Sequence, residues 1–212
     1  GAAEESPEEK KNETDARQFD ALKNDGIAAL KIGQVDYAVT CFSHALQLQD
    51  DLEIHDHLSV AYIHQNQMAN AVNELRLLAD AQPDNQAVWV RMARVCYMME
   101  DYDQMAEACE RAEAVGAGSA EVSYLYAEAR EGQGDKESAV ALLGEAIARD
   151  EHHGAAYLLR GQILMEMDRL EEAETDADYL LEHADLEEDI VLVKARIAHR
   201  AGDQQTACEW YG

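Results

Sequence analysis

The chain has 212 residues and a formal net charge of -27, because 44 acidic residues stand against 17 basic ones. This charge repels phosphate groups and no block of basic residues offsets it, so we expect neither a nucleic-acid partner nor an anionic membrane partner. No apolar run approaches the ~18 residues of a membrane span, so we expect no direct membrane insertion. The composition, with 47% hydrophobic and 6% aromatic residues and two prolines, predicts an almost purely helical protein with an ample core.

The first segment of the chain, GAAEESPEEKKNETDA, is charged and contains almost no large apolar side chain. Ordering it would cost conformational entropy that burial could not offset. We therefore predict an acidic disordered tail over residues 1–18, followed by a folded domain over residues 19–212.

Small or flexible residues recur through the folded part at intervals of 33 or 34 residues. One series is Ala38, Ala71, Met105, Ala139, Ala173 and Ala207, and a second is Gly26, Ser59, Ala93, Ala127, Gly161 and Ala195. Two antiparallel helices approach closely only where no large side chain separates their backbones. The two series therefore predict one small residue on each helix of a repeated helical hairpin.

A third series marks the turn inside each hairpin, and it consists of Gly33, Asn66, Glu100, Gly134, Asp168 and Gly202. Three of these are glycine, which tolerates the positive φ that often ends a helix. Asp101, Asp135 and Asp203 follow directly and are placed to cap the next helix. The predicted units span residues 19–51, 52–85, 86–119, 120–153, 154–187 and 188–212. A single hairpin cannot bury its apolar face, so we expect the units to stack.

These units resemble the tetratricopeptide repeat family, whose 34-residue repeat carries small residues at positions 8 and 20, a turn glycine near 15 and bulky residues at 4, 11, 17 and 24. The first unit matches with Gly26, Gly33, Ala38 and Phe42, and the third with Trp89, Ala93 and Tyr102. The resemblance implies an all-α, right-handed superhelical solenoid of helix-turn-helix repeats. Because the sixth unit stops at Gly212 with its second helix only begun, we expect a longer native protein, or a partner that covers this end.

The cysteines suggest no chemistry. Cys41, Cys96, Cys109 and Cys208 lie in helical patterns without a CxxC motif, which is typical of buried thiols in a reducing compartment. We accordingly expect a cytoplasmic protein, or a periplasmic one if a signal segment was removed.

Other reactive residues also lack catalytic or metal-binding spacing. His55, His57 and His64 share one predicted helix, but residues two apart point away from each other and no HExxH spacing occurs. Gly132 and Gly134 fit a hairpin turn rather than a phosphate loop. We therefore expect no enzyme, no cofactor and no metal site, and an enzyme or metal protein stays only as an outside alternative.

In the resembled family, the first helix of each hairpin lines the concave face that binds peptides. The resemblance places the following residues there: Val90, Arg94, Tyr97, Tyr124, Glu128, Leu158, Gln162, Met165, Leu192 and Arg196. Apolar and aromatic anchors with a few arginines suit an extended or helical peptide. The alternative for each residue is simple packing against a neighbouring helix.

We therefore expect a protein-interaction scaffold that binds a peptide or partner protein in this groove. The alternative is a regulatory module of a larger multidomain protein, in which the solenoid packs against its own neighbouring domain. Clamping the acidic tail of a chaperone, a known use of the family, fits poorly. Two of the five clamp positions match, and the net charge opposes an acidic ligand; those positions hold Lys23, Ile27, His57, Ala87 and Arg91.

Overall fold

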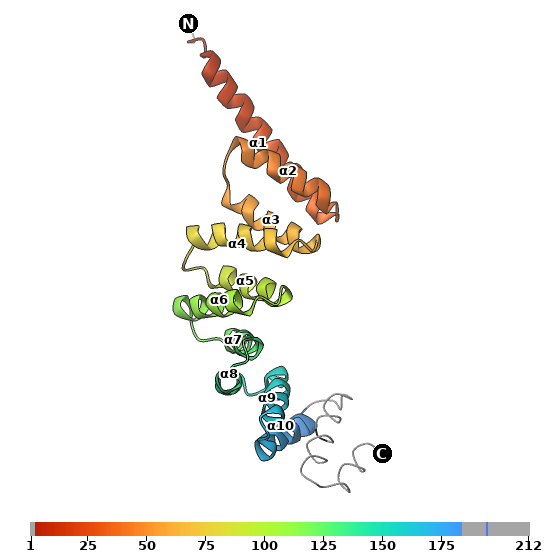
Figure 1. Cartoon of the computed structure of the whole chain (residues 1–212). Coiled ribbons are helices and arrows are strands. Elements are labelled where there is room, and N and C mark those ends of the chain that lie inside the picture. The colour runs from red at the N-terminus through yellow and green to blue at the C-terminus, as the bar shows by residue number, and fades with distance from the viewer. Residues whose placement is uncertain (1–2, 184–193, 195–212) are drawn as a thin grey trace. The chain divides into compact units, whose positions relative to one another are not determined.

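The computed structural model describes residues 3–183 and Lys194, and α-helices are the one type of regular structure in these residues (Figure 1). The chain divides into two compact units between Met99 and Glu100. The fold class predicted from the sequence, an all-α repeat of paired helices, is confirmed. Apart from Lys194, the predicted sixth unit, residues 188–212, lies outside the described residues, as do Leu192, Arg196 and Cys208.

The first unit contains five helices. Within it, α1 pairs with α2 and α3 pairs with α4, while α2 packs on α3 and α4 packs on α5 (Figure 1). Their bounds are α1 Pro7–Lys31, α2 Val35–Leu48, α3 Leu52–His64, α4 Met68–Ala81 and α5 Gln86–Met98.

The second unit repeats this arrangement. Here α7 pairs with α8 and α9 pairs with α10, while α6 packs on α7 and α8 packs on α9. Their bounds are α6 Tyr102–Val115, α7 Ala120–Gly132, α8 Lys136–Arg149, α9 Gly154–Glu166 and α10 Leu170–His183.

The turn series is confirmed at every described position. The φ angle is positive at Gly33 and Gly134, both +81°, and also at three residues that carry a side chain: Asn66 at 58°, Glu100 at 56° and Asp168 at 61°. The predicted caps are confirmed as well. The Asp101 side chain accepts a hydrogen bond from the Gln104 backbone N–H at 3.1 Å, and Asp135 accepts one from Ser138 at 3.1 Å.

The small residues lie where the helices cross. Every described member of both series is buried, and most have no exposed surface at all. A Cβ atom added to Gly26 on α1 would lie 2.6 Å from the ring of Phe42 on α2, closer than atoms can pack. The missing side chain thus makes room for a large aromatic side chain on the paired helix, as the repeat predicted.

The apolar core consists of side chains from successive helices. In the first unit Phe42, Ile54 and Leu58 are buried together, and in the second unit Leu143 and Ile163 are buried with small residues of α7 and α8. The predicted burial of the cysteines is confirmed for Cys41, Cys96 and Cys109, which lie in the interior.

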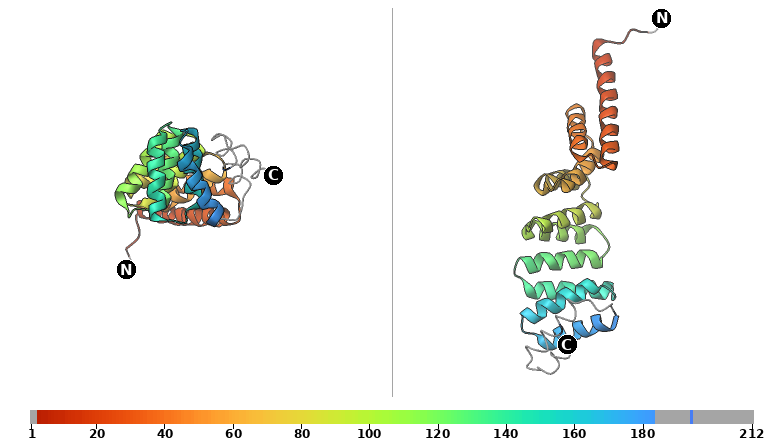
Figure 2. Two further views of the ribbon diagram at one scale, coloured as in Figure 1. Left: turned by 90° about the horizontal axis from the view of Figure 1, so that it is seen from below. Right: turned by 90° about the vertical axis from the view of Figure 1, so that its right-hand side faces the viewer.

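The prediction of a disordered tail over residues 1–18 is wrong from Pro7 onward, where α1 begins. The Ser6 hydroxyl accepts from the Glu9 backbone N–H at 3.2 Å, and the Glu9 carboxylate accepts from the Ser6 backbone N–H at 2.8 Å. This capping box starts a helix of good helix formers, so α1 continues beyond the end of α2 without a buried face (Figure 2). Its first buried side chain is Phe19.

The close approach at Gly26 can be tested by adding one methyl group. Gly26→Ala gains helix propensity of about 1 kcal/mol, but overpacking against the buried Phe42 ring costs ~1–3 kcal/mol. We expect a net loss of stability of about 1 kcal/mol in urea unfolding followed by circular dichroism. The control is Gly144→Ala on α8, where the nearest atom would be 3.7 Å away. This control should stabilise the protein. If Gly26→Ala also stabilises it, that result would contradict the close approach of α1 and α2 at Gly26.

The strained turn at Glu100 gives a second test. A non-glycine residue with positive φ costs about 1–2 kcal/mol, of which the added chain entropy of glycine offsets part. Glu100→Gly should therefore stabilise the protein by about 0.5–1 kcal/mol in the same unfolding measurement. The reverse exchange, Gly134→Glu, should destabilise it. Equal stabilities for all three proteins would show that the turn is not strained.

Candidate functional site

The residues predicted to bind a peptide in the second unit share one property. All of them lie on α7 or α9, the first helices of their hairpins, and each is partly exposed; they are Tyr124, Glu128, Leu158, Gln162 and Met165. They are neither wholly in the core nor wholly in solvent.

Each apolar side chain of this set packs on residues of the core. Tyr124 packs against the core between α7 and α9, and its ring lies 5.0 Å from that of His153, the N-cap residue of α9. Leu158 and Met165 pack against the core around Leu164. The side chains are thus held by packing while part of their surface stays open, which is typical of an anchor residue at an interface.

In the first unit the predicted residues lie on α5. Val90 is half-buried, Arg94 is exposed, and Tyr97 has 45% of its surface exposed. At the corresponding positions of the earlier first helices, α1 and α3, residues such as Ile27 and Ile63 are also half-buried.

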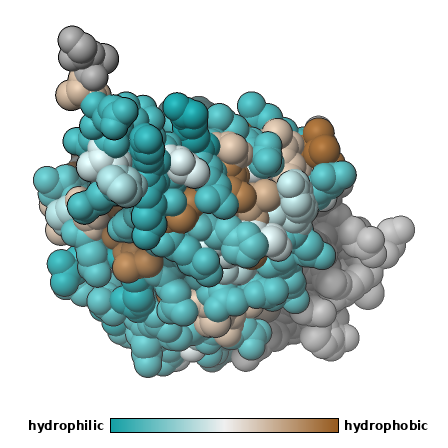
Figure 3. All heavy atoms as spheres, turned by 90° about the horizontal axis from the view of Figure 1, so that it is seen from above, coloured by the Kyte–Doolittle hydropathy of each residue, from teal (hydrophilic) through white to brown (hydrophobic). Residues whose placement is uncertain are grey.

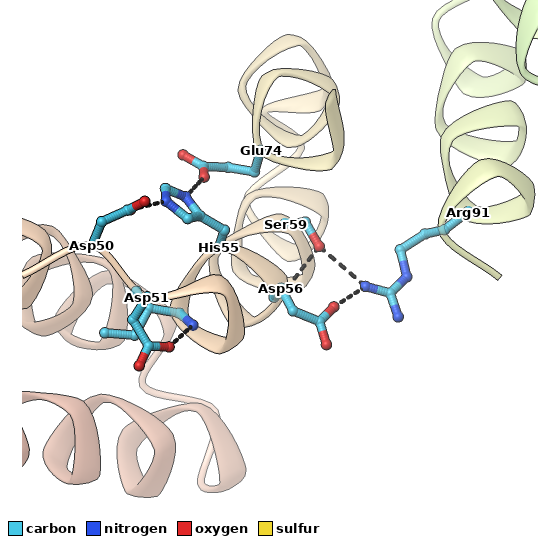
Figure 4. A network of polar contacts seen from close by, with 8 residues as sticks. Asp50, Asp51, His55, Asp56, Ser59, Glu74 and Arg91 are labelled. Carbon is cyan, nitrogen blue, oxygen red and sulfur yellow. Dashed lines mark hydrogen bonds and ion pairs between the residues drawn. The ribbon is translucent and has the colours of Figure 1, made fainter. Parts of the chain in front are cut away.

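The start of α3 carries a dense group of charged side chains, shown in Figure 4. Asp51 caps α3 by accepting from the Ile54 backbone N–H at 3.0 Å, and it also accepts from Lys23 Nζ on α1 at 3.1 Å. The Glu53 carboxylate lies 2.8 Å from the same ammonium. The hydrogen bond with Glu53 raises the pKa of Lys23 even though burial opposes it, so this lysine acts as a tether between helices.

His55 lies between two carboxylates (Figure 4). Its Nδ1 is 2.5 Å from Glu74 Oε2 on α4, and its Nε2 is 2.6 Å from Asp50 Oδ1 in the preceding loop. Carboxylates only accept, so both contacts are satisfied at once when both ring nitrogens carry protons. Burial lowers the pKa of His55, but the hydrogen bonds to Glu74 and Asp50 outweigh it and the pKa lies above 6.5.

Arg91 extends from α5 to α3 in the same region. Its Nη1 donates to the Asp56 carboxylate and, at 3.3 Å, to the Ser59 hydroxyl, which itself donates to the Asp56 carbonyl at 2.7 Å (Figure 4). Asp56 and Arg91 border a cavity of about 280 Å³ between α3, α4 and α5. We call it the α3–α5 notch; Leu52, Leu78 and Val88 form its apolar part, and Asp56, Gln82 and Arg91 its polar part.

A second cavity, of about 240 Å³, lies beside Arg160 of α9 in the second unit. Arg160 donates through Nε and Nη2 to both oxygens of the buried Asp176 carboxylate, at 2.8 and 2.6 Å. The hydrogen bonds to Asp176 raise the pKa of Arg160. Because each charge satisfies the other, this pair joins α9 to α10.

In the described part of the chain, no three His, Cys, Asp or Glu side chains are grouped so that they could hold a metal ion. None of the helices in that part is both long enough and apolar enough to cross a membrane.

Comparison with known proteins agrees with this fold. Residues 132–197 match the tetratricopeptide repeat family. The structure is similar to MamA from Desulfovibrio magneticus, with 16% identity, a TM-score of 0.70, and 78% of this chain and 94% of that chain covered. It is also similar to PilF of Pseudomonas aeruginosa, with 16% identity, a TM-score of 0.67 and coverage of 93% and 90%.

A third similar structure is YrrB, described as a tetratricopeptide-repeat protein with an unusual peptide-binding site. Its identity is 15%, its TM-score 0.65, and 80% of this chain and 88% of that chain are covered. No curated protein sequence matches this chain. The paired helices, the 34-residue period and the family match define a helical repeat protein. Residues 132–197 thus match the tetratricopeptide repeat family, and the described helices share the fold of these tetratricopeptide-repeat structures.

The position of the His55 imidazole between two carboxylates predicts that the stability of the protein depends on pH. The folded-state pKa of His55 lies above its unfolded value near 6.5, so its contribution to stability is complete below pH 6.5 and is lost as the pH rises through the folded pKa. His55→Gln should therefore destabilise the protein more at pH 6 than at pH 9, as measured by urea unfolding at both pH values.

His64→Gln is the matched control, because His64 is an exposed residue of the same helix. It should change stability little at either pH. If His55→Gln destabilises the protein equally at both pH values, the imidazole is not charged between Asp50 and Glu74.

Proposed function

We propose that this protein is an interaction scaffold that binds a peptide or a partner protein along the first helices of its hairpins. The observation that carries the proposal is the partial exposure of Tyr124, Leu158 and Met165 over a packed core. Glu128 and Gln162 lie on the same two helices and supply polar contacts. A few apolar anchors among polar groups is the composition of a protein-binding surface.

The architecture supports the same function. Helical repeats expose an extended surface because each hairpin contacts only its neighbours. The face in Figure 3 is mostly hydrophilic, with hydrophobic residues in small separate patches. YrrB, whose fold is similar, is described as having a peptide-binding site.

The proposal is tested by affinity purification of partners with the full chain and with the double variant Tyr124→Glu, Leu158→Glu. Two carboxylates on partly exposed anchors should weaken partner retention about tenfold or more, while the helical circular dichroism spectrum stays unchanged. Proteins lost selectively from the variant would identify groove ligands.

The matched control is Tyr37→Glu, Leu77→Glu, which changes the same two residue types on the second helices α2 and α4, where both are exposed. This control should retain the partners. Loss of partners in the control and retention in the first variant would move the site to the second helices. Identical partner lists for all proteins would favour the alternative, in which the groove packs against a neighbouring domain of the same protein.

A further inference from the structure

The α3–α5 notch exposes apolar surface that a partner could cover. Leu78 and Val88 are buried at its base, but Leu52 at its edge keeps 38% of its surface exposed. Exposed leucine surface beside a hollow favours an apolar occupant, because burial of such surface contributes about 25 cal/mol per Å².

The polar edge of the notch has hydrogen-bond donors that contact no acceptor in the described part of the chain. Arg91 uses Nη1 for Asp56 and Ser59, while its Nε and Nη2 have no hydrogen-bond partner in the described structure. The amide of Gln82 accepts from Asn85 at 3.1 Å, but its own N–H groups donate to no described residue. A peptide backbone offers carbonyl groups to such donors and N–H groups to the Asp56 carboxylate.

The size of the notch restricts the occupant. Its volume of about 280 Å³ is below the ~300–1,000 Å³ of ordinary small-molecule sites, so it has room for one or two side chains. The cavity is bordered by the ends of three helices, which leaves an extended segment free to continue on both sides of an inserted side chain.

The charges around the notch indicate which type of residue would stand next to the apolar side chain of the occupant. Glu53, which lines the notch, has 58% of its side chain exposed, and the nearby Asp50 has 81% exposed. With a net charge of -27 the whole protein attracts cations and repels anions. Glu53 already contacts Lys23 and Asp50 contacts His55, but the acids of this region outnumber its cations: Asp50, Asp51, Glu53, Asp56 and Glu74 stand against Lys23, His55 and Arg91. A basic residue next to the anchor would therefore be attracted, whereas an acidic one would be repelled.

We propose that the α3–α5 notch seats one apolar side chain of an extended peptide segment that carries Lys or Arg beside it. Leu52 and Val88 contact the anchor, Arg91 and Gln82 donate to the peptide carbonyls, and Glu53 meets the basic residue. This proposal rests on the proposed function, since it assumes a peptide partner, but it concerns the first unit, which the variants at Tyr124 and Leu158 leave intact.

The test fills the notch without touching the core. Ala87 is exposed, lines the notch and is the second residue of α5, so Ala87→Phe places a ring in the cavity. The control is Ala69→Phe, because Ala69 is an exposed alanine at the second residue of α4 and does not line the notch. The probe is a phage-displayed library of random 12-residue peptides, selected on the immobilised full chain.

We expect the selection to enrich sequences with an apolar residue flanked by Lys or Arg. Synthetic versions should bind the unchanged protein and the Ala69→Phe control equally, and Ala87→Phe should bind them about tenfold more weakly or worse. Raising the salt concentration from 50 to 500 mM should weaken binding roughly threefold or more, because the basic flank is attracted through solvent.

Three results would overturn the proposal. Peptides that bind Ala87→Phe as well as the unchanged protein, but lose binding to the Tyr124→Glu, Leu158→Glu variant, would reject the notch and support the proposed function. Enrichment of acidic sequences would contradict the charge argument. If no sequence is enriched, the notch is not a peptide site, and partner retention in the affinity purification still decides the proposed function separately.

Discussion

Close approach of paired helices is the constraint on which the rest of the structure depends. At Gly26 an added Cβ would lie 2.6 Å from Phe42 on the paired helix α2, and the same close approach occurs between successive hairpins, where a Cβ at Gly132 of α7 would lie 2.3 Å from the ring of Tyr102 on α6. A large side chain can be buried at these points only because the facing helix has none. The small residues therefore set the 34-residue period, and the turns with positive φ return the chain at the distance that this packing requires.

Polar side chains then fix which helices meet. Asp51 and Lys23 join α3 to α1, His55 and Glu74 join α3 to α4, and Arg91 joins α5 to α3. Buried and half-buried ion pairs of this kind contribute little net energy compared with apolar packing, but they are costly to break and so favour one pairing. The partly exposed side chains of α7 and α9 outside this network are the ones proposed to anchor a partner in the second unit, and Arg91 and Glu53 of the network border the notch proposed in the first unit.

Much of this could be predicted from the sequence, because the features were local or periodic. The turn residues, the small residues at the crossings and the aspartate caps each depend on a few neighbouring positions, and the structure confirms them at the described residues. The start of α1 was missed because a charged segment without apolar residues was expected to be disordered, whereas the cap at Ser6 and the packed second half of the helix extend it. The network at Asp51 and His55 was missed because, apart from Asp50, the partners that join it to other helices lie 19 to 35 residues away.

The central claim is that partners contact the first helices of the hairpins, and site-specific photo-cross-linking tests it most directly. A benzophenone amino acid would replace Gln162 on α9 in one protein and the exposed Glu145 on α8, a second helix, in another. After irradiation with the partners present, the account predicts covalent adducts from position 162 and few or none from position 145. Adducts from position 145 alone would contradict it and place the binding surface on the second helices.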